Sequence, residues 1–538
     1  MLGFKARDPM LKPARLLVIG ALLIGTGCAT HPRATPGPSL ASASALAPAS
    51  TSATHQCLQW FDRLDAATAQ AGVTDAEFDR IDGFPYLRIN RHALALGQEA
   101  VTPRQQADWA WRLRALDQQA RQTEIANLPA TAIAGLLADT ANQTQSAATP
   151  ALSNDDSGQG LLAHAEACGN KLTGADVQAP PRLSTLRAAA SVADRYALGL
   201  RALGLYPLSR LGVSAGVRRW EADTRARYRA NAADGAEHAN WPAFGRSDAP
   251  DPTDLTALLT NLPVDSLGVP QLSHTLKQQL LAAHAPVFLI EQQSPADAPG
   301  AVMLGSDGLA VVESDKPTLY QRVSFTRYRG RSLIQLVYTL WFPERPVAGA
   351  FDIYAGRLDG VVLRITLDRQ GRPVIVDTIH PCGCYHQFFT AQGVTLRDRP
   401  LSVDARNEWR YLPGATLSPD PGQRLEVAIE AATHYVVGVR YASLTGTHTA
   451  GGQPLNALTP QPERSLTRLN SPHGGPSRSL YGSNGLVAGT ERSERWILWP
   501  MGIASAGAMR QWGHHATAFV GQRHFDDARL MESRFVLP

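Results

Sequence analysis

The spacing of apolar residues changes near residue 285. Upstream, apolar residues recur three and four positions apart, as Trp109, Leu113 and Leu116 do in Gln105–Asn127, which indicates amphipathic helices. Downstream, β-branched and aromatic residues gather in short runs, which indicates strands. The pattern predicts an α+β protein, with a mostly helical domain over residues 55–285 and a mainly antiparallel β-rich domain over residues 286–538. The expected strands are Pro286–Glu291, Leu319–Tyr328, Ser332–Phe342, Val361–Leu367 and Val374–Ile379.

The chain begins with a different pattern. Basic residues precede the short apolar run Leu16–Gly27, which ends at Cys28. The run has about 12 residues, too few for a membrane span, which needs roughly 20, so it reads as the core of a secretory signal. Residues 29–54 are rich in Ser, Ala, Thr and Pro and have too few large apolar groups to fold.

This segment resembles bacterial lipoprotein precursors, with Gly25-Thr-Gly-Cys28 as the lipobox. The resemblance implies a signal peptide over residues 1–27, a lipidated Cys28 and a flexible tether through residue 54. It also implies that the membrane is a partner through the lipid anchor. Ala29, directly after the cysteine, resembles the sorting pattern of outer-membrane lipoproteins. We therefore expect a cell-envelope protein whose mature domains lie in the periplasm.

Composition narrows the possible partners. The chain is 44% hydrophobic and 18% charged, which is typical of a folded water-soluble protein. Its formal charge of +4 falls to about +1 without the signal, which carries four cations and one anion. This near-neutral balance gives no reason to expect nucleic acid as a partner. It does not identify a protein or small-molecule partner.

The cysteines divide by position. Cys28 belongs to the lipid signal, Cys57 and Cys168 lie in the helical region, and Cys382 and Cys384 lie two apart in the β-rich region. An exported compartment is oxidising and permits disulfides. We predict a Cys57–Cys168 disulfide, partly because the other two cysteines look committed to each other or to a metal.

One segment gathers groups that can bind a metal: His380-Pro-Cys382-Gly-Cys384-Tyr-His386. Thiolates and imidazoles are preferred ligands of zinc, copper and some iron sites. In a straight strand the two outer Cα atoms would lie about 20 Å apart, so four ligands on one ion require the segment to curl at Gly383. His514 and His515 could complete the shell. Eight of the 15 histidines lie in residues 380–538, namely His380, His386, His434, His448, His473, His514, His515 and His524.

Other interpretations of this segment stay open. Cys382 and Cys384 could close a tight disulfide, which also needs a bend, or remain buried thiols beside hydrogen-bonded histidines. Nearby Tyr385, Asp377 and Glu344 could assist chemistry. For these three, core packing or solvent exposure is the simpler expectation.

A second motif points to different chemistry. Gly212-Val-Ser214-Ala-Gly216 matches the nucleophile elbow of serine hydrolases, which requires a buried strand before it and a helix after it. The preceding segment contains Pro207 and is a poor central strand. Three functions therefore follow from the sequence. They are an envelope protein with a His/Cys metal site, an envelope scaffold or assembly lipoprotein with structural cysteines, and a serine hydrolase using Ser214.

Overall fold

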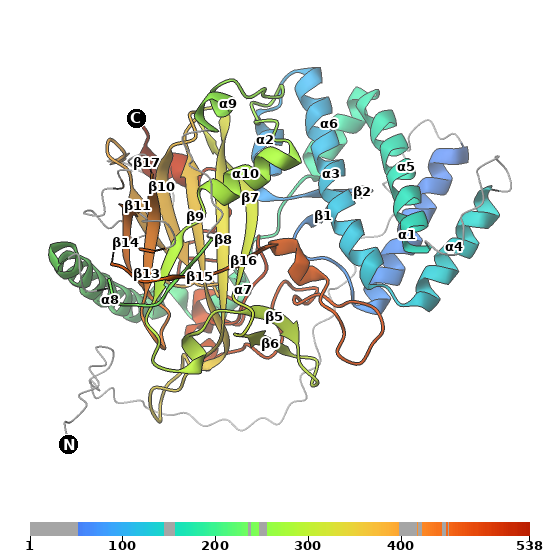
Figure 1. Ribbon diagram of the computed structural model, residues 1–538. Helices are drawn as coiled ribbons and strands as arrows, with labels where there is room; N and C mark the ends of the chain where they lie inside the picture. Colours follow the sequence, from blue (N-terminus) through green and yellow to red (C-terminus); the bar gives the residue numbers. More distant parts are fainter. Residues whose placement is uncertain are drawn as a thin grey trace. The chain divides into compact units, whose positions relative to one another are not determined.

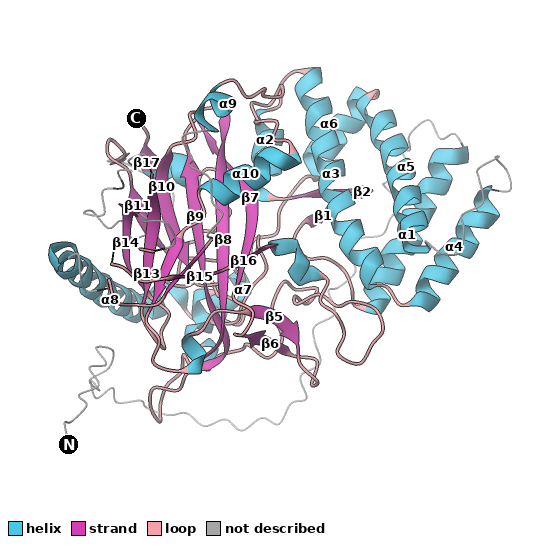
Figure 2. Ribbon diagram, viewed as in Figure 1, coloured by secondary structure: helices cyan, strands magenta, loops and turns pink. Residues whose placement is uncertain are grey.

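Two β-sheets and a group of N-terminal helices make up most of the described chain (Figure 1 and Figure 2). The structure is a computed structural model. It describes residues 52–144, 157–234, 238–246, 255–397, 417, 422–443, 448–449 and 451–538. These residues belong to one compact unit, Ser50–Pro538. The predicted lipidation site Cys28 lies outside the described residues, as does the tether up to residue 51.

The N-terminal helices share a core of their own, which includes Trp60, Phe61 and Trp109. A short hairpin of β1 (Asp79–Ile81) and β2 (Phe84–Ile89) packs beside them. The helices of the described chain are α1 (Ser52–Ala71), α2 (Arg91–Glu99), α3 (Pro103–Asn127), α4 (Ala130–Thr144), α5 (Ser157–Val177), α6 (Pro180–Ala189), α7 (Leu198–Leu203), α8 (Tyr206–Asp234), α9 (Thr256–Thr260), α10 (His274–Ala283), α11 (Arg495–Leu498) and α12 (Leu530–Arg534).

Local signals explain where two of the N-terminal helices begin. Thr102 caps α3 by accepting from the backbone N–H of Gln105, whose side chain bonds back to Thr102, and Pro103 occupies the first turn. Asn90 caps α2 by accepting from the N–H of Ala93. Both starts are therefore fixed by side chains readable in the sequence.

The larger sheet has six strands in the order β11-β10-β9-β8-β7-β16, antiparallel except for the β16–β7 pair. A second sheet has the order β14-β13-β4-β3-β15. The bounds are β3 (Ala243–Gly245), β4 (Val287–Ile290), β7 (Thr318–Tyr328), β8 (Arg331–Arg345), β9 (Gly356–Leu367), β10 (Pro373–Ile379), β11 (Gln387–Thr390), β13 (Gln423–Ile429), β14 (Val436–Ser443), β15 (Leu455–Ala457) and β16 (Thr459–Pro462). Two smaller pairs are β5 (Ala301–Leu304) with β6 (Ala310–Glu313), and β12 (Thr395–Leu396) with β17 (Phe535–Val536).

The main hydrophobic core lies between the two sheets. Leu363 of β9, Val427 of β13 and Leu280 of α10 all belong to this one buried cluster. Along β9, residues of the other parity, such as Val362, face a different cluster that contains Trp512 and Phe525 of the C-terminal segment. The six-stranded sheet is therefore covered on both faces, which explains its long runs of buried residues.

The α+β class expected from the sequence is confirmed, with helices first and mostly antiparallel sheet later. The expected hairpin of Val361–Leu367 and Val374–Ile379 forms as β9 and β10. The helices before residue 285 and the strands after it do not form separate cores throughout, however. Helices α9 and α10 contribute to the core between the sheets, and Tyr228 of α8 donates its hydroxyl to the carbonyl of Val436.

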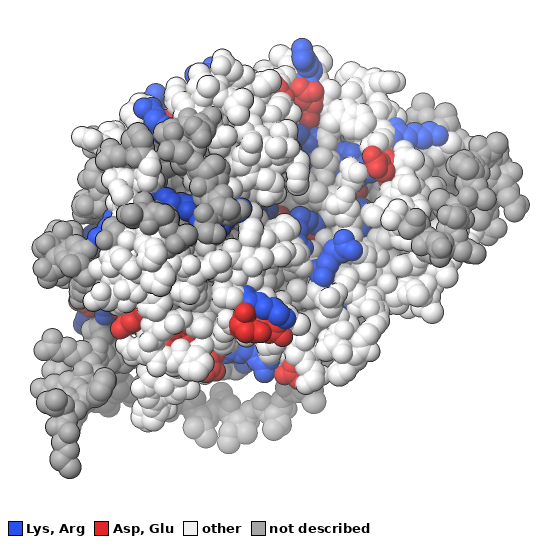
Figure 3. All heavy atoms as spheres, in the orientation of Figure 1, with Lys and Arg blue, Asp and Glu red and all other residues white. Residues whose placement is uncertain are grey.

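Charged side chains do not gather on the face shown in Figure 3. Lys, Arg, Asp and Glu side chains lie scattered there among uncharged residues. No helix in the described ranges is both long and apolar enough to cross a membrane.

The predicted disulfide between Cys57 of α1 and Cys168 of α5 is present. It closes a loop of 111 residues, and loop-closure entropy predicts that a disulfide over this length stabilises the fold by about 4–5 kcal/mol.

We expect the free energy of unfolding of the variant Cys57→Ser/Cys168→Ser, measured by urea titration, to be about 4–5 kcal/mol lower than that of the wild type. Adding a reductant should then destabilise the wild type and leave this variant unchanged, and a variant as stable as oxidised wild type would contradict the assignment.

Candidate functional site

The His380–His386 segment curls, as four converging donors would have required. The N–H of Gly383 donates to the carbonyl of His380 at 2.8 Å, and the N–H of His380 donates to the carbonyl of Cys384 at 3.0 Å. Gly383 has φ +92°, and a Cβ there would lie 2.7 Å from the carbonyl oxygen of Ala516. Only glycine fits this turn, since a side chain would be both strained and obstructed.

The curl separates the two histidines of the segment. His380 directly follows β10, and its Nδ1 lies 3.2 Å from Asp359 Oδ1. His386 lies after the turn and its Nε2 lies 2.8 Å from Asp377 Oδ2, a carboxylate that Arg364 also binds. Asp359 and Asp377 lie on opposite faces of the sheet, because they share parity with Leu363 and Ile379, which belong to different cores. The expected convergence of His380 and His386 on one point is therefore not found.

His514 and His515 are also held by protein groups. His514 Nε2 lies 2.6 Å from the carbonyl oxygen of Ala76, and His515 hydrogen-bonds to the backbone of Pro381. Burial lowers the pKa of His514 to about 4 and that of His515 to about 3. Both imidazoles are therefore neutral, and one of them tethers the C-terminal segment to the N-terminal region.

The thiols lie together without a metal-type shell. Cys382 and Cys384 are buried, are not disulfide-bonded, and share a hydrogen bond. That bond lowers the pKa of Cys382, and it raises the pKa of Cys384 well above its usual value. Across the described parts of the chain, no group of three or more His, Cys, Asp or Glu side chains is arranged to hold a metal ion.

The centre of the region is the buried carboxylate of Asp359. Besides His380, it binds Nδ1 of His434 at 3.0 Å through Oδ2, and Arg492 Nη2 lies 3.4 Å from Oδ1. Burial alone would raise the pKa of Asp359, but Arg492 and the two histidines outweigh it and hold the pKa well below its usual value. Asp359 is therefore an anion shared by three side-chain donors.

The pKa values of the two histidines on Asp359 shift in opposite directions. The Nε2 of His434 faces Asp297 Oδ1 at 3.5 Å, so this imidazole lies between two carboxylates, which outweigh its burial and raise its pKa. Burial lowers the pKa of His380 despite Asp359, and its Nε2 has no hydrogen-bond partner. His380 is therefore a neutral imidazole with one nitrogen oriented by a carboxylate and the other available as a base.

A buried cation lies beside this pair. Arg345 ends β8 and its residue is 8% exposed, yet within the described residues no carboxylate lies within 4 Å of its guanidinium. Its hydrogen bonds, to the carbonyl of Thr433 and the hydroxyl of Tyr435, are both 3.4 Å long. Tyr354 and Tyr435 lie under the guanidinium, with ring centroids 5.5 and 5.2 Å away. The neighbouring Glu344 is exposed, because strand alternation directs the two side chains to opposite sides.

Aromatic rings enclose this cation and His380. The ring of Tyr385 lies 5.0 Å from His380, 4.5 Å from Tyr435 and 5.2 Å from Trp220 of α8. Tyr385, Tyr435 and Trp220 are each partly exposed. They therefore form the solvent-facing edge of the region, outside the buried His380–Asp359 pair.

Backbone strain concentrates here. In the described part of the chain seven non-glycine residues have a left-handed φ, and four of them flank this site. They are Leu358 (53°), Tyr385 (62°), Ala432 (62°) and His434 (53°). Each such residue costs of the order of 1 kcal/mol or more, and such strain clusters at functional sites.

Glu494 adds a second titratable group. It is buried, and burial raises its pKa to about 7 despite Arg492 and Arg345. A Cβ on Gly507 would collide with Oε1 of Glu494, so a glycine at that position makes room for the carboxyl group. A carboxyl with a pKa near neutrality can act as an acid.

Ser214 is placed differently from a nucleophile elbow. It lies inside α8 (Tyr206–Asp234), and its hydroxyl donates to the carbonyl of Leu211 in the same helix at 2.9 Å. No strand-to-helix turn surrounds it, so the context that the motif needs is missing.

Sequence reasoning found part of this site. It singled out His380 and the bend at Gly383, and it weighed Tyr385. It missed Arg345 and Asp359, which carry the charge of the site. The available signal was the string Leu358-Asp-Gly360 directly before the apolar run Val361-Val-Leu363, where a buried carboxylate would require a partner.

Comparison of the chain with protein-family models, curated proteins and solved structures finds no match.

The buried neutral histidines predict acid sensitivity. In the folded protein their pKa values are depressed, so below pH 6.5 the unfolded chain binds more protons and stability falls as the pH is lowered toward 4. Each contributes up to about 1.4 kcal/mol per pH unit in that window. Urea titrations at several pH values will measure the slope. The residues, each with its pKa in the folded protein in parentheses, are His92 (about 3), His284 (about 4), His386 (about 3), His514 (about 4) and His515 (about 3).

The variant His515→Gln tests one of these residues. Between about pH 4 and 6 this variant should take up one proton fewer than the wild type on unfolding, so its stability should fall less steeply as the pH is lowered. The exposed His473 provides the control, since His473→Gln should leave the slope unchanged. Equal slopes for wild type and His515→Gln would contradict the assignment of a neutral buried imidazole.

Proposed function

We propose that the chain is a lipid-anchored cell-envelope protein with an acid–base site for a small anionic substrate, either a phosphate ester or an ester that also carries a free carboxylate. The observation that supports this most is the buried guanidinium of Arg345, which has two long hydrogen bonds and no carboxylate within ion-pair distance in the described chain. A buried charge is costly unless it is paired. The planar guanidinium suits a phosphate or carboxylate, which it can bind through two parallel hydrogen bonds.

The groups around Arg345 suit such an anion. The hydroxyl of Tyr435 lies 3.4 Å from the guanidinium, and Tyr385 packs against Tyr435. Tyrosine hydroxyls donate to anionic oxygen, and their rings exclude water from the charge pair. Trp220 of α8 adds a partly exposed ring beside Tyr385 at the solvent-facing edge. An anion entering past these rings would meet the buried guanidinium of Arg345, which has no carboxylate within ion-pair distance among the described residues.

His380 supplies the base. Asp359 accepts the proton of His380 Nδ1 and so fixes the tautomer that leaves a lone pair on Nε2. In hydrolysis, Nε2 takes a proton from the attacking water while the water oxygen bonds to phosphorus or carbon. The bond to the leaving oxygen breaks, and Glu494, which holds a proton near neutral pH, protonates that oxygen.

The other functions expected from the sequence are not supported by a converged site. A bound zinc, copper or iron ion stays a prediction, as does the scaffold role. The Cys382–Cys384 thiol pair is the feature that metal analysis of the native protein would address. Envelope localisation is part of this proposal and rests on the resemblance of residues 1–28 to lipoprotein precursors.

Replacing Arg345 tests the anion site. We expect Arg345→Met to weaken binding of inorganic phosphate or acetate by about ten- to a hundredfold, the loss of one charged hydrogen-bond pair. The same variant should be as stable as wild type, or more stable, in anion-free buffer, because an uncompensated buried charge is removed. Calorimetric titration and thermal unfolding measure both effects. The matched control is Arg357→Met on the neighbouring strand, since Arg357 is partly exposed and paired with Asp307.

A structural role for Arg345 gives the opposite result. In that case Arg345→Met would lower stability in anion-free buffer, and anions would stabilise wild type and variant equally. Comparing phosphate with acetate shows which of the two anion classes the site prefers.

Replacing His380 tests the chemistry. His380→Gln should abolish hydrolysis of p-nitrophenyl phosphate or p-nitrophenyl succinate, whichever the wild type cleaves, and should keep anion binding within about threefold of wild type, because Arg345 is intact. His473→Gln, on an exposed residue, is the control. If the wild type binds anions but cleaves neither ester, the site is a binding site and the acid–base proposal fails.

Replacing Cys28 tests the anchor. Cys28→Ser should move the protein from the membrane fraction to the soluble fraction of the envelope and should remove the mass of the lipid. Cys382→Ser serves as the control and should leave fractionation unchanged. Membrane association that survives Cys28→Ser would exclude the lipid anchor.

A further inference from the structure

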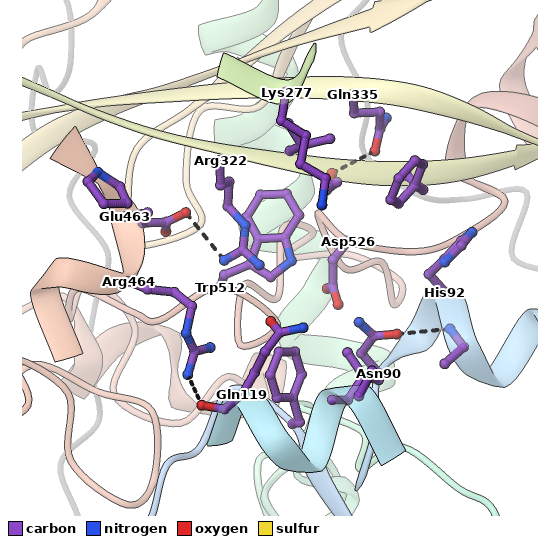
Figure 4. A pocket seen from close by; sticks show the side chains of 18 of the residues that line it. Asn90, His92, Gln119, Lys277, Arg322, Gln335, Glu463, Arg464, Trp512 and Asp526 are labelled. Atoms are coloured by element: carbon purple, nitrogen blue, oxygen red, sulfur yellow. Dashed lines mark hydrogen bonds and ion pairs between the residues drawn. The ribbon is translucent and has the colours of Figure 1, made fainter. Parts of the chain in front are cut away.

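A cavity of about 450 Å³ lies between the N-terminal helices and the six-stranded sheet, away from the His380 site (Figure 4). Its walls come from α2, α3, α10, the β7 strand and the C-terminal segment. The volume is in the range of small-ligand sites. Figure 4 shows Lys277 reaching into it from α10, Gln119 on α3 across from it, and Trp512 beside Arg322.

One wall of this cavity is an unpaired strand edge. β16 pairs with β7 only as far as Gln321, and the N–H of Thr459 donates to the carbonyl of Pro317. Farther along, the N–H of Arg327 donates to the carbonyl of Ala528. Odd-numbered residues of β7 therefore direct their backbone groups away from β8, since these groups alternate along an antiparallel strand.

Between these two attachments the edge is open. Val323 and Phe325 line the cavity, and neither has a backbone partner on this side among the described residues. From Gln321 to Phe325 the strand spans about 13 Å at 3.3 Å per residue. That length accommodates three or four residues of an added extended chain.

A buried polar atom independently points to a missing partner. Gln321 is 6% exposed and lines the cavity, and its Oε1 has no hydrogen-bond partner. An unmade bond of this kind costs about 1–3 kcal/mol, and a ligand with an N–H or O–H donor would supply it.

The charges of the cavity leave one cation unmatched. Lys277 is half-buried on α10, and in the described chain its side-chain ammonium has no hydrogen bond or ion pair. The other charged residues of the wall are matched. Their pairs are Arg112–Asp265, Arg322–Glu77, Arg322–Glu463, Arg464–Asp75, Arg464–Glu77 and Asp526–Arg91.

We propose that this cavity binds a short extended peptide, which adds as a strand to the β7 edge and places a carboxylate against Lys277. The backbone groups of Val323 and Phe325 repeat at the spacing of a β-ladder, which a peptide matches and a sugar does not. The N–H groups of the peptide or its side chains would also satisfy Gln321. This binding site is separate from the anion site at Arg345, so neither proposal depends on the other.

The test uses acetyl-tetra-alanine with a free C-terminal carboxylate, the same peptide as its C-terminal amide, and an N-methylated version of the carboxylate peptide. Calorimetric titration against the full-length protein measures their affinities. We expect the carboxylate peptide to bind, the amide to bind about tenfold more weakly, the loss of one charged contact, and the N-methylated peptide not to bind. N-methylation removes the donors of the ladder without changing the charge.

The variant Lys277→Met completes a cycle with these peptides. It should lower the affinity for the carboxylate peptide to that of the amide peptide and leave the affinity for the amide peptide unchanged. Lys171→Met, on an exposed residue of α5, is the matched control and should change neither affinity.

Three results would overturn the proposal. They are no binding of the carboxylate peptide at millimolar concentration, equal binding of the N-methylated peptide, and equal weakening of both unmodified peptides by Lys277→Met. Binding of maltotriose in place of the peptides would assign the cavity to a saccharide instead. The peptide comparisons use wild-type protein, so they decide the question even if Lys277→Met folds poorly.

Discussion

The burial of one carboxylate, Asp359, determines how the end of the β-sandwich is arranged. A carboxylate removed from water must recover its lost solvation from nearby donors. Asp359 does so with His380, His434 and Arg492, and with the N–H of Gly360 at 3.0 Å. The three side-chain donors come from three separate parts of the chain, so the charge holds together the end of β10, the turn before β14 and the C-terminal segment.

The same requirement explains why strained backbone persists here. His434 has a left-handed backbone conformation where it meets Asp359, and its ring stacks on Phe342 with centroids 4.0 Å apart. Tyr385 is likewise left-handed, directly after the turn that places His380. Packing and ion pairing therefore hold conformations that the local sequence does not favour. A rigid, desolvated environment of this kind is what a base such as His380 requires to keep one orientation.

The helices and strands could be predicted from the sequence better than the arrangement of the site could. Helix α3 and the β9–β10 hairpin were predicted from periodicity and turn residues, and the Cys57–Cys168 disulfide from the number and position of cysteines. Each of these predictions depends on neighbouring residues or on the number of cysteines, and none depends on how distant segments pack. The positions of His380 and His386 on opposite faces depend on how the turn at Gly383 packs against Ala516, more than a hundred residues away. Ligand spacing along the chain could not predict this, because it describes a straight strand.

Charge pairing also explains why β7 has an open edge. Glu77 of the N-terminal region binds Arg322 of β7 at 2.6 Å and Arg464, just after β16, at 2.8 Å. These buried or half-buried pairs fix the N-terminal helices against the sheet at the point where β16 ends. The chain after β16 turns into a short 3-10 helix at Glu463 instead of continuing along β7. The edge beyond Gln321 is thereby covered by helices, which cannot pair with a strand, and its backbone groups face a cavity. An open edge enclosed in this way is protected from aggregation while remaining available to a short ligand.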